Sequence, residues 1–526
     1  MKSLDQDLNV KKLSIGIDIG GTNTDGVIVD ATQNIIFTHK TLTTKDLVSG
    51  VSSVLSHLCS LLKEKIKDQC EITGIFIGTT QATNAILQGT DLYKVGLIRI
   101  AGHNPQTISP AYTWPEKIRE VILAGSVNIN GGFECDGREI TKFNTSELLD
   151  AIDTLIAQGA QSLSLVGVFS SLYNTHENIA CELIKQKCGN NFPVTCSYKV
   201  GGLGFIEREN ATILNSALKK NISKHFGALV PVCEKFTQAP VYITQNNGTI
   251  MTLEQACEFP VLTIAAGPTN SFVGGALLGK KENTVVVDIG GTSTDVGLIQ
   301  NGFARRSLYT SNIGGIALNF PMPDVLSIAC GGGSHITLTP QIKIGPNSCA
   351  HELFIKACVF GGDTLTLTDC AISAGTLDIS GANKSLIGIS KSEAQVVLSK
   401  AQEEISDLIT RIKGPHKDLP VILVGGGAAL FNKNSFLDQC EIPEHFDVAN
   451  AYGAACARIA ATIDTVISLD KRDETLETLC AQASSMAESK GAQKETISIV
   501  QKEIIPYFYI PGNKARVIIT AAGKRT

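Results

Sequence analysis

One eight-residue motif occurs twice in the chain, 270 positions apart. The segment from Asp18 to Asp25 returns as the segment from Asp288 to Asp295, and seven of the eight residues are identical. Each copy contains a Gly-Gly pair, and each lies between two apolar runs rich in β-branched residues. A glycine turn between two such runs is typical of a β-hairpin. The repeat therefore predicts two equivalent hairpins, one in each of two duplicated lobes.

The segments around the repeat alternate between expected strands and helices, as an α/β fold requires. Residues 162–169 read as a buried strand, and residues 392–412 read as a helix. Asn144 and Glu147 resemble a capping box at the start of another helix. Residues 312–381 are rich in glycine and are expected to form β-structure. We therefore predict an α/β fold with two duplicated lobes and an additional β-rich insert.

The chain of 526 residues is too long for one hydrophobic core, so two or three domains are expected. We place the first lobe, with the first motif, at residues 1–190 and the second lobe at residues 191–470. A C-terminal extension is expected at residues 471–526, as a helix, a Pro511-Gly512 turn and a terminal strand.

The composition argues against several classes of function. The formal net charge is −5 and no long basic run occurs, so neither nucleic acid nor an anionic membrane surface is an expected partner. No apolar stretch is long enough to span a bilayer, and Asp18 interrupts the first apolar segment, so a cytoplasmic protein is expected. The 15 cysteines include no Cys-x-x-Cys pair and the 9 histidines no His-Glu-x-x-His motif. Free thiols are expected, disulfides stay open, and a zinc site has little support.

A Gly-Gly pair at a hairpin tip is suited to phosphate, because backbone N–H groups approach an anion closely where no Cβ intervenes. A carboxylate beside such a tip repels phosphate unless a cation such as Mg²⁺ lies between them. Asp18 and Asp288 are therefore the expected metal-binding residues. An isolated Gly-Gly-Thr turn is usually only a tight turn, but two facing loops would clamp a triphosphate. The expected phosphate-binding residues are Gly20, Gly21, Thr22, Thr24, Gly290, Gly291, Thr292 and Thr294.

A third glycine cluster follows the expected buried strand at residues 421–424. Gly425, Gly426 and Gly427 form a loop on whose backbone a planar base can lie, so they are expected to bind the adenosine part of a nucleotide. Residues 331–335 form a further glycine segment, which is either part of an acceptor pocket or a turn between strands.

Residues 78–84 read as a strand end, a threonine-rich turn and a helix start. Such a segment presents N–H groups and hydroxyls to a phosphate in the cleft, which makes Thr79 and Thr80 candidate catalytic residues. The alternative is an ordinary capped helix.

The order of two phosphate loops followed by Gly-Gly-Gly resembles the actin and sugar-kinase superfamily of ATPases. Within it, the chain resembles the A-type subunit of the hydantoinase and 5-oxoprolinase family over nearly its whole length. The segments that carry this resemblance are residues 16–25, 78–84, 207–210, 245–248, 266–268, 287–296, 322–324, 331–334 and 511–513. The resemblance implies two actin-like lobes around an ATP cleft.

The resemblance also implies an activity. In this family, ATP phosphorylates the carbonyl oxygen of a cyclic amide, and water then opens the activated ring. Asp18 and Asp288 would hold Mg²⁺ and act in catalysis together with Thr79 and Thr80. Residues 345–362 depart from the family pattern, so the substrate stays open between cyclic amides and ketones. No segment resembles the B-type subunit, so such a subunit is a possible partner, and an oligomer is expected.

Two other functions fit the same lobes. A small-molecule kinase would release a stable phosphorylated product, whereas ring opening would be accompanied by release of phosphate. A regulatory ATPase would use lobe closure to act on a protein and would be stimulated by that protein instead of by small lactams.

Overall fold

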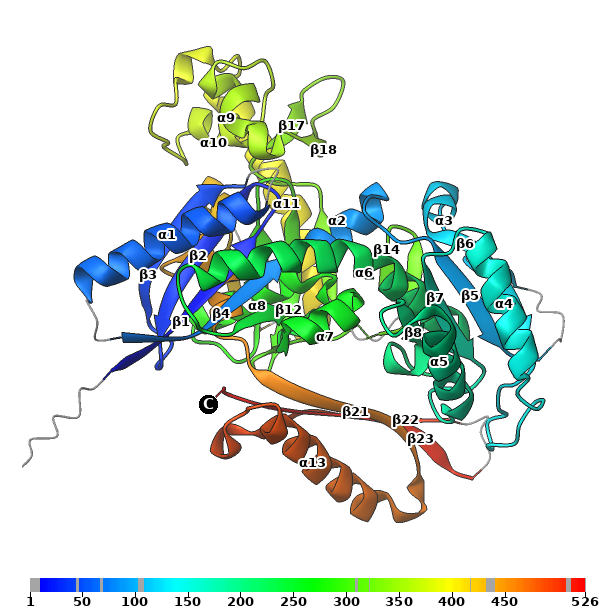
Figure 1. Cartoon of the computed structure of the whole chain (residues 1–526). Helices are drawn as coiled ribbons and strands as arrows, with labels where there is room; N and C mark the ends of the chain where they lie inside the picture. The colour runs from blue at the N-terminus through cyan, green and yellow to red at the C-terminus, as the bar shows by residue number, and fades with distance from the viewer. Residues whose placement is uncertain are drawn as a thin grey trace, which may run out of the picture.

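Each copy of the repeated motif forms the turn of a β-hairpin in the computed structural model (Figure 1). The structure describes residues 10–43, 47–66, 70–102, 108–307, 311–320, 322–416, 418–431, 440–507 and 512–525. The hairpin strands are β1 (Lys11–Ile19) with β2 (Asn23–Asp30), and β11 (Thr284–Ile289) with β12 (Thr294–Gln300). The registers agree, since Asp18 faces Asp25 in the first hairpin and Asp288 faces Asp295 in the second. The predicted pair of equivalent hairpins is confirmed.

The first hairpin belongs to a six-stranded sheet. Its strands in spatial order are β10 (Ile250–Thr252), β9 (Val241–Thr244), β4 (Cys70–Thr79), β1, β2 and β3 (Ile35–Leu42). Alternate residues of a strand face the same side of a sheet, and Leu13, Ile15, Ile17 and Ile19 of β1 are all buried. These side chains form one core with α1 (Leu47–Lys65) and α6 (Phe205–Glu234).

The second hairpin belongs to another six-stranded sheet. Its strands are β13 (Phe303–Ala304), β12, β11, β19 (Val421–Val424) and β20 (Cys440–Glu441) in spatial order, with β16 (Val325–Ile328) paired to β12. Val285, Val287 and Ile289 of β11 are buried against α10 (Leu367–Ala374) and α11 (Lys391–Lys413). β19 begins and ends at the residues predicted from the sequence, and α11 exceeds its predicted range by one residue at each end.

The two lobes meet where α8 (Ala266–Leu278) crosses α12 (Ala449–Ala455). Both helices have a glycine at the crossing, because a Cβ on Gly274 would overlap the carbonyl oxygen of Ala449, and one on Gly453 would overlap that of Asn270. α8 packs on the second sheet and α12 on the first. This crossing holds the two lobes close together. The two motif turns face each other across the space between the lobes.

Two further layers flank the lobes. One is a parallel sheet of β6 (Leu123–Ile129), β5 (Val95–Ile100), β7 (Ser162–Gly167) and β8 (Val194–Cys196), packed against α4 (Thr145–Ala157) and α5 (Thr175–Cys188). The predicted cap of α4 is present, since the Asn144 side chain accepts hydrogen bonds from the N–H groups of Ser146 and Glu147. The N-terminal half of the chain also forms the helices α2 (Gln81–Gln88), α3 (Glu116–Ile122) and α7 (Leu253–Glu258).

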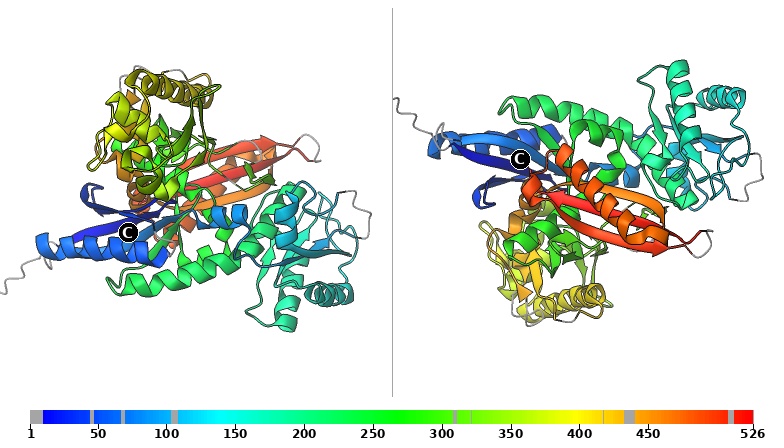
Figure 2. Two further views of the ribbon diagram at one scale, coloured as in Figure 1. Left: turned by 90° about the horizontal axis from the view of Figure 1, so that it is seen from above. Right: turned by 90° about the horizontal axis from the view of Figure 1, so that it is seen from below.

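The other layer is C-terminal and lies across the lower side of the molecule, as the view from below in Figure 2 shows. It consists of a three-stranded antiparallel sheet and one helix that packs on it. These elements are β21 (Ile459–Ser468), β23 (Lys514–Gly523), β22 (Ser498–Pro506) and α13 (Arg472–Ser489). The expected helix and terminal strand are present, β22 was not predicted, and Pro511 of the expected turn lies outside the described residues.

The expected β-rich insert is only half correct. Its strands are β14 (Ser311–Ile313), β15 (Ile316–Leu318), β16, β17 (Ser334–Thr337) and β18 (Lys343–Ser348). Beyond Ser348 the chain forms α9 (Leu353–Lys356) and α10 instead. A capping box explains α10, because the Thr366 hydroxyl accepts from the Asp369 N–H while the Asp369 carboxylate accepts from the Thr366 N–H.

No helix within the described ranges combines the length and the apolar character that crossing a membrane requires.

Candidate functional site

A cavity of about 480 Å³ separates the two motif turns. Its volume is within the range usual for small-molecule sites. The turns approach closely, since a Cβ on Gly291 would lie 3.1 Å from the Thr22 hydroxyl. Gly425, Gly426 and Gly427 border the same cavity. The structure therefore brings together the three glycine segments that the sequence analysis singled out.

Four carboxylates of the repeated motifs line this cavity, two from each hairpin. Burial raises the pKa of Asp18 to about 7, and the neighbouring Asp25 carboxylate adds to the rise. Burial also raises the pKa of Asp25 and of Asp295 to about 6, and it raises that of Asp288. Four partly desolvated carboxylates around one cavity favour a cation as ligand.

The first hairpin leaves its carboxylates only partly satisfied. Asp18 accepts one hydrogen bond from the Asn450 side-chain amide at 3.2 Å, and its Oδ1 atom is buried without a hydrogen-bond partner. Asp25 lies 3.6 Å from the Lys40 ammonium, and its Oδ1 atom also lacks a hydrogen bond. Lys40 in turn donates to the Asp447 carbonyl oxygen at 2.8 Å.

The second hairpin satisfies its carboxylates with serines. Ser271 of α8 donates to Asp288, and Ser327 of β16 donates to Asp295. Gly425 has a positive φ of 82°, and a Cβ there would overlap the Oδ1 atom of Asp288. Glycine at this position thus leaves room for the Asp288 carboxylate beside the third glycine segment.

These residues fit a magnesium site of one particular kind. Among the described residues, no three His, Cys, Asp or Glu side chains are arranged to hold a metal by themselves. Mg²⁺ usually keeps several waters and binds one or two carboxylates together with substrate phosphates. The buried, unpartnered Oδ1 atom of Asp18 and the carboxylate of Asp288 across the cavity suit that arrangement.

Residues 331–333 support the second motif turn. The N–H groups of Gly332 and Gly333 donate to the carbonyl oxygens of Gly290 and Gly291, at 3.0 and 2.7 Å. A Cβ on Gly331 would lie 2.7 Å from the Gly290 oxygen. Of the two readings left open by the sequence, the structure favours the glycine turn, although Gly332 reaches the cavity lining.

Not every predicted threonine faces the cavity. Thr22, Thr292 and Thr80 line it, together with the glycines at positions 20, 21, 290 and 291. Three others do not and are buried. Thr24 is hydrogen-bonded to Thr43, Thr294 donates to the Cys330 carbonyl, and Thr79 accepts from the Gln81 N–H at the start of α2. Their hydroxyls are engaged within the protein, so the geometry does not support the predicted phosphate or catalytic contacts of these three side chains.

Several lining residues were missed by the sequence analysis. Asp25 and Asp295 close the repeated motif, so their identity in both copies was a usable signal. Lys40 lies opposite Asp25 on the neighbouring strand β3, so the pairing of β2 with β3 was a usable signal for it. Asn450 lies far from both motifs in sequence and carries no local pattern that would single it out. Four apolar residues also line the cavity, from the insert that was expected to be β-structure: Leu353, Phe354, Leu377 and Ile379.

Two family models match the chain. Residues 14–188 match the model described as hydantoinase/oxoprolinase N-terminal region, and residues 208–383 match the model described as hydantoinase/oxoprolinase. Together the two matches cover more than half of the chain.

Curated relatives include the caprolactamase subunit alpha of Pseudomonas jessenii, which is 24% identical over 396 residues, or 70% of this chain and 55% of that protein. The acetone carboxylase beta subunit of Xanthobacter autotrophicus is 26% identical over 409 residues, or 69% of this chain and 54% of that protein. The chain thus matches about half the length of these relatives.

Two solved structures share the fold. The ATP-dependent caprolactamase of Pseudomonas jessenii superposes with a TM-score of 0.75 at 19% identity, over 97% of this chain and 87% of the other. Nucleotide-free acetone carboxylase gives a TM-score of 0.72 at 17% identity, over 98% and 88% of the two chains. The similarity confirms the α/β fold class that the sequence predicted.

Proposed function

The chain belongs to the hydantoinase/oxoprolinase family, and we propose that it binds ATP with Mg²⁺ between its two motif turns to phosphorylate a carbonyl oxygen of a small molecule. The observation that carries this proposal is the single cavity bordered by both Gly-Gly turns, by four motif carboxylates and by the third glycine segment. Such a cavity offers donors for phosphates, carboxylates for a cation and a flat backbone surface for a base, all at one place.

Each group has a role in the proposed complex. The N–H groups of the paired glycines, with the hydroxyls of Thr22 and Thr292, bind phosphate oxygens. Asp18 and Asp288 hold Mg²⁺, which when bound neutralises charge on the phosphates during transfer. Lys40 offsets the negative charge of Asp25, which keeps the cavity from repelling the nucleotide. Thr80, at the start of α2, binds the transferred phosphoryl group.

The base is proposed to lie between residues 425–427 and an apolar wall formed by α9 and the segment after α10. Backbone without Cβ atoms accepts a flat ring on one side. Apolar side chains on the other side remove that ring from water, which favours binding by about 25 cal/mol for each Å² of apolar surface buried.

The substrate class is proposed to be a small cyclic amide or a ketone. Amide resonance makes a lactam carbonyl a poor electrophile, and transfer of a phosphoryl group to its oxygen removes that difficulty. The names of two relatives, a caprolactamase subunit and an acetone carboxylase subunit, support both members of this class. Both names refer to carbonyl compounds, and the two solved structures are both described as ATP-dependent systems.

A second subunit is proposed to complete the reaction, because the caprolactamase and acetone carboxylase relatives are themselves named as subunits. A phosphorylated amide is unstable in water, so its formation and its further reaction belong in connected sites. The nucleotide is proposed to lie between the two lobes. The first lobe extends beyond the expected boundary at residue 190, since β9, β10 and α6 complete its sheet and core. The C-terminal layer begins with β21, before the expected boundary at residue 470.

The test is to incubate the purified chain with ATP and Mg²⁺, and with hydantoin, a small lactam or acetone in turn. Phosphate release and the organic product are both measured, and the melting temperature is recorded with and without Mg²⁺-ATP. We expect a higher melting temperature with the nucleotide, since a ligand of the folded state stabilises it by mass action. We also expect phosphate release that one of these substrates stimulates.

The products distinguish the alternatives. A stable phosphorylated compound would establish a kinase, and stimulation only by a protein would establish a regulatory ATPase. Stoichiometric ring opening by the chain alone would contradict the need for a second subunit. Absence of any thermal shift with Mg²⁺-ATP would contradict the nucleotide site itself.

A further inference from the structure

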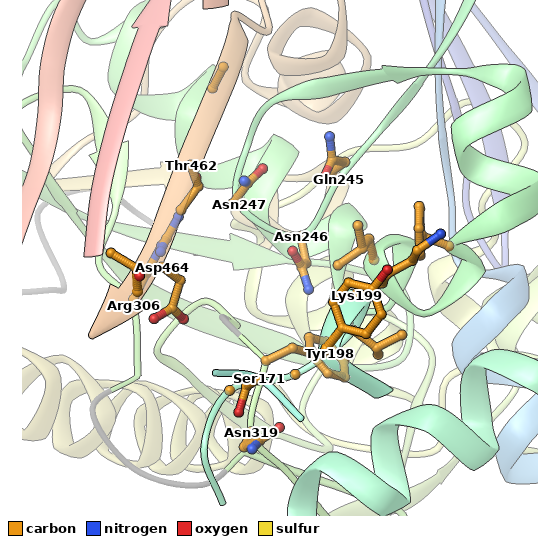
Figure 3. Close-up of a pocket in the computed structure, with 18 of the residues that line it drawn as sticks. Ser171, Tyr198, Lys199, Gln245, Asn246, Asn247, Arg306, Asn319, Thr462 and Asp464 are labelled. Carbon is orange, nitrogen blue, oxygen red and sulfur yellow. The ribbon is translucent and has the colours of Figure 1, made fainter. Parts of the chain in front are cut away.

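A second cavity, of about 390 Å³, shares no lining residue with the cavity between the motif turns. Figure 3 shows much of its lining, which comes from several separate parts of the chain. Residues 198–203 follow β8, residues 245–249 follow β9, and β21 contributes Thr462 and Asp464 from the C-terminal sheet. Cavities at such junctions of folded units are common places for ligands.

Unpartnered polar atoms concentrate in this cavity. Seven buried side-chain nitrogen or oxygen atoms in the described ranges have no hydrogen-bond partner, and three of them belong to its lining. They are Arg306 Nη1, Asn246 Nδ2 and Asn319 Oδ1. Asn246 is only 2% exposed. Since buried polar groups in native proteins nearly always have partners, these three atoms leave hydrogen-bonding capacity that a ligand or ordered water would satisfy.

The three atoms require different partners. Burial lowers the pKa of Arg306 only to about 10, so its guanidinium is a charged donor at neutral pH. Asn246 Nδ2 is a neutral donor. Asn319 Oδ1 is an acceptor, because the other end of that amide is fixed by its hydrogen bond to the Gly204 carbonyl at 3.0 Å. The matching ligand has an anionic group, a second acceptor oxygen and one donor.

The surrounding charges also favour an anion. Lys199 and Lys490 line the cavity together with Arg306. Lys199 also pairs with the exposed Glu258 at 3.8 Å. The carboxylate of Asp464 is occupied, since Arg516 donates to both of its oxygens. The negative charges of Glu503, which does not line this cavity, and of Asp464, which does, both act on Arg306.

The lining is held in place before any ligand arrives. The buried Arg208 donates to the carbonyl oxygens of Gly202 and Leu203, at 2.8 and 3.1 Å, and so fixes the loop after β8. Around Asn246, the backbone N–H donates to Leu262 at 2.9 Å, and the carbonyl accepts from Thr269 of α8 at 2.8 Å. A lining fixed in this way loses little conformational entropy when a ligand binds.

We propose that this cavity binds a small organic carboxylate that carries a second acceptor oxygen and one hydrogen-bond donor. The carboxylate lies against Arg306, the second oxygen accepts from Asn246, and the ligand's donor meets Asn319 Oδ1. This binding does not depend on the nucleotide site or on the activity proposed for it.

The test is isothermal titration calorimetry of the full chain with four carboxylates: succinamate, N-acetylglycinate, glycolate and malate. Succinamide serves as the neutral counterpart of succinamate. We expect at least one carboxylate to bind with a dissociation constant below about 1 mM, which is usual for a weak specific ligand, and no binding of succinamide.

Two variants locate the binding. Arg306→Gln is expected to weaken it at least tenfold, and Lys199→Glu at least threefold. The Lys199 side chain is 43% exposed, so that variant retains its fold even if Arg306→Gln does not. Arg138→Gln is the matched control, because Arg138 is 79% exposed and pairs only with Asp136 on another part of the surface. Failure of all four carboxylates at 10 mM, equal binding of succinamide, or unchanged binding in a folded Lys199→Glu variant would overturn the proposal.

Discussion

The two motif turns have nearly the same sequence but different surroundings. In the second hairpin, Ser271 and Ser327 donate to the two carboxylates, and residues 331–333 add backbone hydrogen bonds beneath the turn. In the first hairpin, the support for Asp18 is one amide from Asn450, and both motif carboxylates keep a buried oxygen without a hydrogen bond. The carboxylates of the second turn are therefore satisfied by serines, whereas those of the first keep unused hydrogen-bonding capacity beside Lys40.

This difference shows that duplication of a motif does not duplicate its role. Identical carboxylates differ in what they still need, because the neighbours that satisfy them come from other parts of the chain. We infer that the first turn supplies most of the cation affinity and that the second mainly sets the position of the phosphates.

Removing either central carboxylate is expected to have the largest effect. Asp18→Asn and Asp288→Asn should each lower Mg²⁺-dependent ATP turnover at least about 100-fold, as loss of one charge-stabilising group usually does. Only Asp18→Asn should also raise the Mg²⁺ concentration needed for half-maximal thermal stabilisation by ATP. The measurements are steady-state kinetics and melting curves across Mg²⁺ concentrations.

Circular dichroism spectra of both variants serve as the control for folding. Wild-type turnover in both variants would contradict a nucleotide site formed by the two turns. Equal Mg²⁺ dependence in both would remove the difference between the turns.

The next largest effect is expected from a substitution in residues 331–333, which support the second turn. Gly331→Ala puts a Cβ 2.7 Å from backbone atoms of the second turn, and such overpacking costs about 1–3 kcal/mol of folding free energy. Gly21→Ala is the matched change in the first turn, where a Cβ meets nothing within 4 Å. Urea unfolding should show a loss for Gly331→Ala and little change for Gly21→Ala. Equal losses would mean that the first turn is as tightly supported as the second.

The pH dependence of stability tests the unsatisfied carboxylates. Because their folded-state pKa values are raised, the folded protein holds protons that the unfolded chain has lost above its own pKa near 3.8. Stability should therefore fall as pH rises through 6 and 7, by about 1–2 kcal/mol between pH 5.5 and 8 without ligand. Chemical denaturation at several pH values measures this change.

Asp18→Asn is the control for that experiment, because the Asp18 pKa of about 7 makes it the largest contributor in this range. His39 acts in the opposite direction, since burial lowers its pKa, but it is present in both proteins and cancels in their difference. A wild-type profile that matches the variant profile would contradict the unsatisfied state of Asp18.

The smallest effect is expected from the last threonine of the second motif. Thr294→Val removes the hydrogen bond to the Cys330 carbonyl and should cost about 1 kcal/mol of stability, with ATP turnover unchanged. Thr292→Val should instead weaken ATP binding with little effect on stability, because Thr292 lines the cavity. Nucleotide titration of both variants decides the matter. A loss of ATP affinity in Thr294→Val would restore the phosphate contact predicted from the sequence.

The parts of the fold that were predictable depend on local signals. The two hairpins, β19 and the cap of α4 follow from periodicity and from turn or capping residues that are neighbours in sequence. The helices after Ser348 were missed because a β-rich, glycine-rich composition masked the capping box at Thr366 and Asp369. β22 was missed because Ser498–Pro506 is recognisable as a strand mainly through its pairing with β23.

The same distinction between local and non-local signals applies to the candidate site. The glycines of all three segments could be placed at the cavity from sequence order alone, and the structure agrees. The orientation of individual hydroxyls could not, because Thr22 lies in the turn before β2 begins, whereas Thr24 lies within β2 and is buried beside Thr43. Lys40 was missed although it lies directly opposite Asp25 in the pairing of β2 with β3. Asn450 could not be found, since only tertiary packing brings it to Asp18.

The crossing of α8 and α12 has a consequence for the synthesis of the chain. α12 lies more than 400 residues after β1, and a Cβ on Gly16 of β1 would overlap the Ala451 carbonyl of α12. The first lobe therefore cannot bury this face of its sheet until most of the polypeptide has left the ribosome. During that interval Val27 and Val29 stay open to solvent, since the core that covers them includes α12. Exposed strands of this kind aggregate readily, so this face of the first sheet is protected only after residue 455 has been synthesised.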